Sequence, residues 1–183
     1  MRVISCKRII REKLYKLILQ NKNNMPTLQF VSEEGKEMNQ IRELFREYQQ
    51  ALGEDLCFQS FEAELENPLK KYDLNKGAIL LAYHENEVCG CIALQSLDDK
   101  EKAVCEMKRL YVRPAFRKLG IGKLLVDKIL EVAIEKGYKK MKLDTLKRLE
   151  AAIDLYKTYG FTTTQPYYQN PLGDVVYMEK DLS

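Results

Sequence analysis

The most informative stretch of this chain is Leu110-Tyr111-Val112-Arg113-Pro114-Ala115-Phe116-Arg117-Lys118-Leu119-Gly120-Ile121-Gly122-Lys123. Apolar strand residues end at Val112, a loop follows, and a helix then opens with two glycines. A helix start presents unpaired N–H groups and about half a positive charge, and glycine lets phosphates approach the backbone closely. Four basic side chains add charge at the same place: Arg113, Arg117, Lys118 and Lys123. The stretch therefore predicts a site for a ligand that carries phosphates.

The spacing of this stretch argues against two common nucleotide sites. A Walker A loop would need glycine where the chain has Arg117. A dinucleotide fingerprint would need a third glycine where the chain has Leu125. Asp144 ends the next predicted strand, in the region where a ribose-binding acid would lie, but the loop between Val112 and Gly120 is too long for the tight dinucleotide turn. Both nucleotide interpretations therefore fail on spacing.

Outward from this stretch, hydrophobic periodicity predicts an α/β sheet of mixed direction. Ser32 is the expected cap of the first long helix and Gly53 its end, while Asn67-Pro68 would break the second. Glu85-Asn86 is the expected turn of a hairpin. Helices are predicted at 33–52, 58–69, 120–136 and 149–159. Strands are predicted at 28–32, 78–83, 87–95, 103–112, 140–145, 161–167 and 175–180.

Two separate patterns resemble those of the GNAT superfamily of N-acetyltransferases. Arg-x-x-Gly-x-Gly at Arg117–Gly122, after a Val-Arg-Pro strand end, resembles the acetyl-coenzyme A loop of that family. The run Ala151-Ala152-Ile153-Asp154-Leu155-Tyr156-Lys157-Thr158-Tyr159-Gly160-Phe161 resembles its Ala-x-x-Leu-Tyr-x-x-x-Gly-Phe pattern. The resemblance extends from about Thr27 to Leu182. It implies an α/β GNAT fold, with a mixed, mostly antiparallel central sheet that is splayed in the middle and flanked by helices on both faces.

The resemblance also implies acetyl-coenzyme A as co-substrate. Its pantetheine arm would lie in an opening between the strands that end near Val112 and Thr145, extending the sheet along β-strand main chain. The coenzyme-binding residues would be Leu110, Tyr111 and Val112 for the arm, and Arg117, Lys118, Leu119, Gly120, Ile121, Gly122 and Lys123 for the diphosphate. Many relatives bond the arm with an asparagine after the next motif strand, and the segment Thr145-Leu146-Lys147-Arg148-Leu149 offers none.

The reaction implied is direct attack of a primary amine on the thioester carbonyl in a ternary complex. An alkylammonium has a pKa of about 10.4, so the site must accept a proton at neutral pH. Glu106 is the candidate general base, and Tyr156 matches the tyrosine that faces the coenzyme's sulfur and protonates the departing thiolate. A main-chain N–H of Leu110–Val112 would stabilise the developing oxyanion. The alternatives are that Glu106 pairs with a cation in Met107-Lys108-Arg109 and that Tyr156 only packs.

The acceptor is expected to be a small-molecule amine, framed by the first loop and the last two strands. Hydrogen bonds and cation–π contacts would hold it, from Phe58, Tyr167, Tyr168 and Asn170. The alternative is a turn stiffened by Pro166 and Pro171, with tyrosines that cover the sheet. Two other functions remain open, namely a protein or peptide N-acetyltransferase and a sensor that binds acetyl-coenzyme A without turnover.

Charge is distributed unevenly along the chain. Residues 1–25 carry seven basic side chains and one acidic one, a net charge of +6, which leaves residues 26–183 at −3. A mildly acidic body argues against a nucleic-acid partner. The basic segment is an extension to the acetyltransferase domain at 26–183. Its apolar residues follow helical spacing, so it could be a packing helix or docking arm, a membrane-surface or targeting amphipath, or an artefact of start-site choice before Met25-Pro26.

Composition excludes several other classes. Five cysteines without a Cys-x-x-Cys pair, and the single histidine His84, predict no metal site. No apolar run approaches the roughly 18 residues that span a bilayer. An odd cysteine count without a secretion signal predicts a cytoplasmic protein, and exposed strand edges are compatible with a homodimer. His84 is expected near a hairpin tip, facing solvent.

Overall fold

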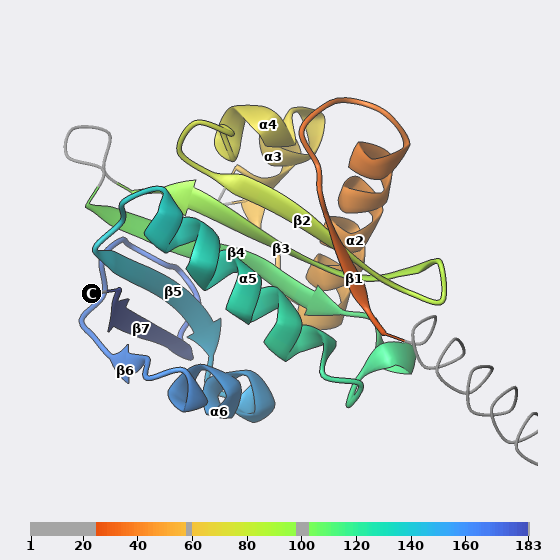
Figure 1. The fold of residues 1–183 in the computed structure, drawn as a ribbon. Helices are drawn as coiled ribbons and strands as arrows, with labels where there is room; N and C mark the ends of the chain where they lie inside the picture. The colour runs from red at the N-terminus through yellow and green to blue at the C-terminus, as the bar shows by residue number, and fades with distance from the viewer. Residues whose placement is uncertain (1–24, 58–59, 98–102, 183) are drawn as a thin grey trace, which may run out of the picture.

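Within residues 25–57, 60–97 and 103–182, which the computed structural model describes, the chain folds around a seven-stranded sheet in the order β1-β2-β3-β4-β5-β7-β6 (Figure 1). Neighbours β4 and β5 are parallel, and the other described neighbours are antiparallel. The strands are β1 (Thr27–Phe30), β2 (Ala78–His84), β3 (Glu87–Ser96), β4 (Val104–Val112), β5 (Lys140–Leu146), β6 (Thr162–Thr163) and β7 (Val175–Asp181). The predicted mixed, mostly antiparallel sheet is confirmed.

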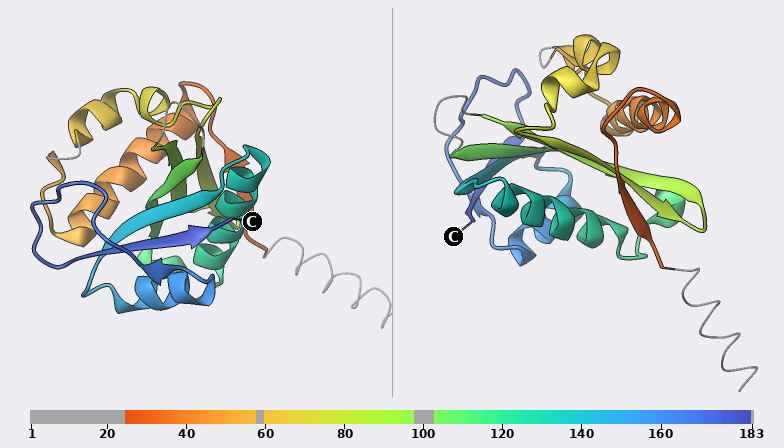
Figure 2. Two further views of the ribbon diagram at one scale, coloured as in Figure 1. Left: turned by 90° about the vertical axis from the view of Figure 1, so that its left-hand side faces the viewer. Right: turned by 45° about the horizontal axis from the view of Figure 1, so that its top comes forward.

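Helices cover both faces of this sheet (Figure 2, right). On one face lie α5 (Ile121–Glu135) and α6 (Glu150–Thr158), and on the other lie α2 (Lys36–Leu52), α3 (Phe61–Glu66) and α4 (Pro68–Lys71). Alternate residues of the inner strands enter two separate cores. Leu80 packs with the α5 residues, whereas Ile79 and Leu81 pack with those of α2. Strands covered on both faces are near-continuous in apolar residues, as in β2.

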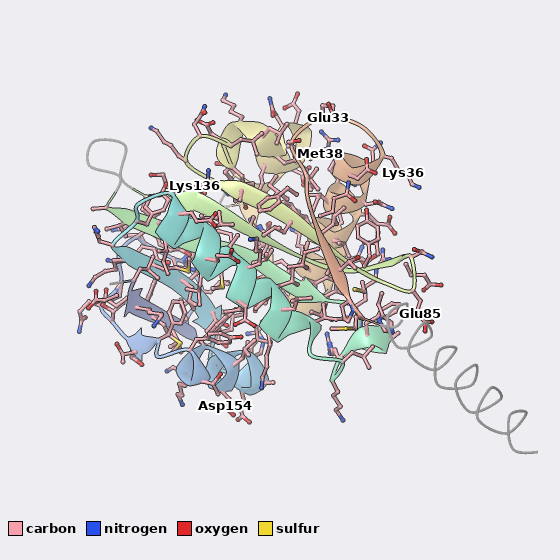
Figure 3. All side chains as sticks on the ribbon, viewed as in Figure 1. Glu33, Lys36, Met38, Glu85, Lys136 and Asp154 are labelled. Carbon is pink, nitrogen blue, oxygen red and sulfur yellow. The ribbon has the colours of Figure 1, made fainter. Side chains whose placement is uncertain are left out.

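The long helices end as their glycines predict, but α2 begins later than expected. Gly53 is left-handed at φ 69° and donates its N–H to the carbonyls of Gln49 and Gln50. The helix starts at Lys36 after Gly35, and Ser32 is not its cap, so that prediction is wrong. The reason is that Val31 still donates to Ile79 of β2, at 2.9 Å, which keeps the chain extended beside the sheet. Met38 is the first fully buried side chain of α2 (Figure 3).

The hairpin of β2 and β3 turns at Glu85 and Asn86, which both have positive φ, as predicted (Figure 3 labels Glu85). His84 is not simply solvent-facing. Its ring lies edge-on to Phe116 with centroids 6.0 Å apart, and its Nδ1 is buried with no partner among the described residues. The hairpin end therefore packs against the turn Pro114–Phe116, which follows β4.

Two predicted elements are shorter than expected. The helix predicted at 58–69 becomes α3 and α4, separated at Asn67, whose side chain accepts the N–H of Lys70 and caps the second helix. The strand predicted at 161–167 is confined to β6, because the chain leaves the ladder before Pro166, which has no N–H to donate. Residues 1–24 of the basic extension, and Phe58, lie outside the described residues. Among the described helices, none is long and apolar enough to cross a membrane.

Candidate active site

The sheet opens between β4 and β5, as predicted. The two strands pair only from Val104 with Lys140 to Glu106 with Lys142, and beyond that point they diverge (Figure 1). The opening holds a cavity of about 70 Å³. Its walls come from both faces of the sheet, since Tyr48 belongs to α2 and Tyr156 to α6. The cavity therefore connects the two faces through the gap in the sheet.

The loop before α5 fits a diphosphate. Among the described residues, none of the main-chain N–H groups from Lys118 to Lys123 donates to a protein acceptor. Lys118 and Gly120 are both left-handed, at φ 67° and 78°. A Cβ on Gly122 would lie 3.7 Å from Leu155 and 4.0 Å from Val112, which are ordinary contact distances. The protein's own packing does not require glycine at position 122, so the open space suits a ligand that approaches the backbone.

The side chains of the predicted coenzyme loop are exposed at its surface. Arg117 donates from Nε to the carbonyl of Val112 at 3.3 Å, and Lys118, Leu119 and Lys123 are exposed. Arg113 does not belong to this group, contrary to the expectation that it adds charge there. Its guanidinium donates to Glu43 and Glu47 of α2, so two carboxylates neutralise it. The positive charge at the loop comes instead from the two lysines and Arg117.

The predicted strand residues of the coenzyme site lie along the open part of β4. Leu110 lines the cavity, and Tyr111 and Val112 follow it where β4 no longer pairs with β5. Tyr111 is buried with its ring edge-on to Tyr48, and Ile121 is buried at the start of α5. The main chain of this part of β4 is therefore available to an extended ligand on the β5 side.

Tyr156 of α6, the predicted partner of the coenzyme's sulfur, lies at the cavity. The side chain lines the cavity and is 7% exposed. Its ring packs edge-on against Phe161, with centroids 5.9 Å apart. The hydroxyl has no hydrogen-bond partner among the described residues. Burial raises the pKa of Tyr156 above its ordinary value, so the phenol keeps its proton.

Glu106 lies at the base of the opening within a network of charges. It is 2% exposed, and Oε1 accepts from the Tyr167 hydroxyl at 2.6 Å and from Lys108 Nζ at 3.3 Å. Lys108 also donates to Asp144 of β5, at 3.3 Å. Burial opposes the charge of Lys108, but the two carboxylates raise its pKa above its ordinary value. The pairing with a cation, one of the two alternatives for Glu106, is therefore present, and Asp144 rather than Glu106 lines the cavity.

The predicted acceptor residues of the last loop gather on this network. Tyr168 donates to Asp144 Oδ2 at 2.9 Å, and Asn170 donates to the Tyr168 hydroxyl at 2.8 Å. The rings of Tyr167 and Tyr168 pack on Tyr177 of β7, at centroid distances of 5.3 and 5.6 Å. Asn170 also lines the cavity and borders an open hollow of about 740 Å³ beneath the same loop. Asn170 and Leu172 line both the cavity and this hollow.

A β-bulge in β4 adds a residue that the sequence did not single out. Cys91 pairs with Tyr111 and Ala93 with Lys108, so two residues of β4 oppose one of β3, and Arg109 there has φ 57°. Arg109 turns toward α3, where Nε and Nη2 each donate to Glu64 at 2.7 Å. Burial opposes the charge of Glu64, but Arg109 and Lys71 outweigh it and lower the pKa of Glu64 to about 2. This pair is sealed from solvent on the α2 side of the sheet.

Sequence reasoning did not assign Lys108, Arg109, Asp144 or Glu64 to the site. The signal available was Lys108-Arg109 itself, two charged residues in the middle of an otherwise apolar central strand. Such charges are buried only when they have partners. Glu106, a partner of Lys108, is two residues away on β4, but Glu64 on α3 and Asp144 on β5 lie far away in the chain, so no local pattern identifies them.

Comparisons with known proteins agree with this geometry. The sequence model described as the acetyltransferase (GNAT) family matches residues 38–161. An uncharacterized N-acetyltransferase of Schizosaccharomyces pombe is 44% identical over 149 residues, which cover 81% of this chain and 90% of that protein. An acetyltransferase structure from Streptococcus agalactiae has a TM-score of 0.71 at 19% identity, covering 85% of this chain and 98% of that one. A Salmonella typhimurium structure solved with its cofactor acetyl-CoA has a TM-score of 0.66 at 20% identity, covering 87% of this chain and 95% of that one. The chain therefore belongs to the GNAT family of acetyl-CoA-dependent N-acetyltransferases.

Proposed function

We propose that the protein transfers an acetyl group from acetyl-coenzyme A to the primary amine of a small molecule, by direct attack in a ternary complex. The observation that carries this proposal is the cavity in the opening of the sheet, which Tyr156, whose hydroxyl has no hydrogen-bond partner among the described residues, and Asp144 both line. Direct transfer needs a group that receives a proton from the ammonium and a group that protonates the leaving thiolate, each within hydrogen-bond reach of its atom.

The coenzyme would occupy the α5 side of the opening. When bound, acetyl-coenzyme A supplies the acetyl group as a thioester. The free N–H groups of Lys118–Lys123 would hold the diphosphate, and Arg117 would add charge beside it. The unpaired edge of Leu110, Tyr111 and Val112 would position the pantetheine arm and present a main-chain N–H to the carbonyl oxygen.

The amine would enter from the α2 side. Glu106, Lys108 and Asp144 together carry a net charge of −1, which favours an ammonium group nearby. The ammonium must lose a proton before its nitrogen can attack. Asp144 lines the cavity and is placed to accept that proton first. Glu106, the base predicted from the sequence, shares Lys108 with Asp144 and would act behind it.

Tyr156 would complete the transfer. As the new C–N bond forms, the nitrogen gives up its second proton to solvent, and as the C–S bond breaks, the sulfur takes up a proton from the Tyr156 hydroxyl, which solvent then restores. Burial keeps this hydroxyl protonated at neutral pH. It makes no hydrogen bond to the described protein that would have to break first. An acid catalyst of this kind contributes about 10²- to 10⁴-fold to a rate.

The small cavity favours a small acceptor. A volume of about 70 Å³ is room for roughly five waters, enough for an amine with a short stem. Phe58 stays a prediction for this site, as do Tyr167, Tyr168 and Asn170 as direct substrate contacts. The alternatives of a protein or peptide acceptor and of a sensor without turnover remain hypotheses, as do the homodimer and the cytoplasmic location.

The test is release of free coenzyme A from acetyl-coenzyme A in the presence of an acceptor panel of amino acids, polyamines, aminoglycosides and peptides. Release with small amines, together with mass detection of the acetylated product, is the expected result. Release only with peptides would instead support the protein-modifying alternative. Tight coenzyme binding without release for any amine would support the sensor.

A further inference from the structure

The guanidinium of Arg109 is only partly satisfied. Its side chain is 2% exposed, and Glu64 engages Nε and Nη2 side-on. The third nitrogen, Nη1, has no hydrogen-bond partner among the described residues. Arg109 lines the cavity, so this donor is available to whatever fills the cavity. Nη1 is not itself a sealed atom, because His84 Nδ1 is the only fully buried side-chain polar atom without a partner among the described residues.

The surroundings of Arg109 hold it in one orientation. The guanidinium carbon lies 5.1 Å from the ring centroid of Phe61 and 5.7 Å from that of Tyr48. The bulge at Arg109 directs the side chain to the α2 side of the sheet, the side from which the acceptor would enter. Bulges of this kind often re-aim a side chain beside an active site. The residue is therefore a fixed donor rather than a flexible surface cation.

The charges around the cavity are separated into two groups. Glu106, Lys108 and Asp144 carry a net −1. Glu64 is divided between Arg109 and Lys71, so a single carboxylate serves two cations. An acceptor that carries both an ammonium and a carboxylate matches this separation. A simple alkylamine or a polyamine would leave Nη1 unpaired.

We propose that the acceptor is an amino acid, whose carboxylate binds Nη1 of Arg109 while its amine lies beside Asp144. This inference rests on the proposed function and names its substrate class. Arginine suits the role because it is permanently charged and binds carboxylates in fixed geometry. The reaction itself is unchanged: the amine nitrogen is acetylated, and the carboxylate remains bound and takes no part in bond making.

The test uses matched acceptors that differ only in the carboxylate. The pairs are lysine with cadaverine, and 4-aminobutyrate with propylamine. The expected result is a kcat/KM at least about tenfold higher for the carboxylate-bearing member of one or both pairs, since a charge-assisted hydrogen bond contributes on that order. Equal kcat/KM within both pairs would overturn the inference while leaving the acetyltransferase proposal intact.

A double variant tests Arg109 itself without leaving the carboxylate of Glu64 buried beside a missing arginine; Lys71, the second partner of Glu64, is 23% exposed. Arg109→Met with Glu64→Gln removes both members of the ion pair, which proteins tolerate better than removal of one. The preference for the carboxylate-bearing amine should fall to near one. The control is Arg42→Met with Glu34→Gln, which makes the same two substitutions in a more exposed pair, between α2 and the segment before it, whose members do not line the cavity, and should keep the preference. A preference that survives in the Arg109 double variant would contradict the assignment.

A binding measurement separates this inference from the proposed function. Thermal unfolding of the wild-type protein is followed with lysine or with cadaverine, with and without coenzyme A. Suppose that lysine but not cadaverine raises the melting temperature, and that no amine releases coenzyme A in the acetyl-coenzyme A assay. This result would support the carboxylate site and overturn the enzymatic proposal. Release of coenzyme A in the acetyl-coenzyme A assay, with equal changes in melting temperature for lysine and cadaverine, would support the enzymatic proposal and overturn the carboxylate site. Neither stabilisation nor release would overturn both.

Discussion

The two ends of the active-site opening differ in how the chain builds them. The proposed coenzyme end is one continuous segment, from Leu110 to Lys123, and its chemistry would depend on backbone N–H groups and on glycine. The proposed acceptor end is assembled from α3, β4, β5 and the loop before β7, and its chemistry would depend on buried side chains. The first is determined by local sequence, and the second exists only once the sheet has formed. Substitutions at the two ends should therefore fail in different ways.

The largest expected effect is at the coenzyme end. Gly122→Glu should reduce affinity for coenzyme A by at least about 100-fold, because a carboxylate would meet the diphosphate. Calorimetric titration with coenzyme A measures this affinity. Gly122→Ala is the control for folding: its Cβ would lie 3.7 Å from Leu155, so the melting temperature should be maintained or raised. Unchanged affinity in Gly122→Glu would show that the loop is wrongly assigned.

The next effect concerns acid stability at the acceptor end. The folded pKa of Glu64 is about 2, below its ordinary value of 4.5, so its stabilisation is complete above about pH 5 and is lost as the pH falls toward 2. The loss should be at most about 3 kcal/mol in the free energy of unfolding. Urea unfolding of the wild type and of Arg109→Met with Glu64→Gln, at pH 6 and pH 3, measures it. Equal pH dependence in the two proteins would contradict this account.

Tyr156 sits between the two ends, and its removal should affect chemistry alone. Tyr156→Phe should lower kcat by about 100-fold with little change in coenzyme affinity. Because burial raises the pKa of Tyr156 above its ordinary value, the wild-type rate should not fall near pH 10 through loss of this proton. Steady-state kinetics from pH 6 to pH 10 test both points. If kcat of Tyr156→Phe equals that of the wild type, Tyr156 only packs and is not the acid.

The smallest expected effects distinguish the two carboxylates. Asp144→Asn should lower kcat/KM for the amine by about tenfold at pH 7, because it removes the carboxylate that lines the cavity. Glu106→Gln should lower the rate less, with coenzyme binding intact. Amine kinetics at pH 6 to 9 compare them. A larger loss of kcat/KM in Glu106→Gln than in Asp144→Asn would make Glu106 the direct base. No loss in either variant would exclude both carboxylates as the general base.

The difference between the two ends also explains what the sequence could predict. Periodicity and glycine located the long helices, the hairpin and the loop before α5, because those depend on residues close in the chain. Two signals misled. Ser32 looked like a helix cap, but backbone pairing of Val31 with β2 delayed the helix. Arg113 looked like part of the phosphate site, but it forms ion pairs with two carboxylates of α2.

The loop residues Tyr167, Tyr168 and Asn170 were singled out from the sequence, but the role of Arg109 could not be predicted, for a physical reason. A bulge changes which face each side chain of β4 occupies, and no local pattern marks it. Regular alternation would place Arg109 with Met107 in the α5 core, whereas the extra residue sends it to Glu64 on the opposite face. The charged pair Lys108-Arg109 showed that buried partners must exist, but not which residues they are.

The most direct test of the central claim is a crystal structure of the protein with coenzyme A. The expected result places the diphosphate on the N–H groups of Lys118–Lys123 and the pantetheine arm along Leu110–Val112, with its sulfur near the Tyr156 hydroxyl. A coenzyme bound elsewhere, or a β4–β5 opening that excludes the arm, would contradict the account.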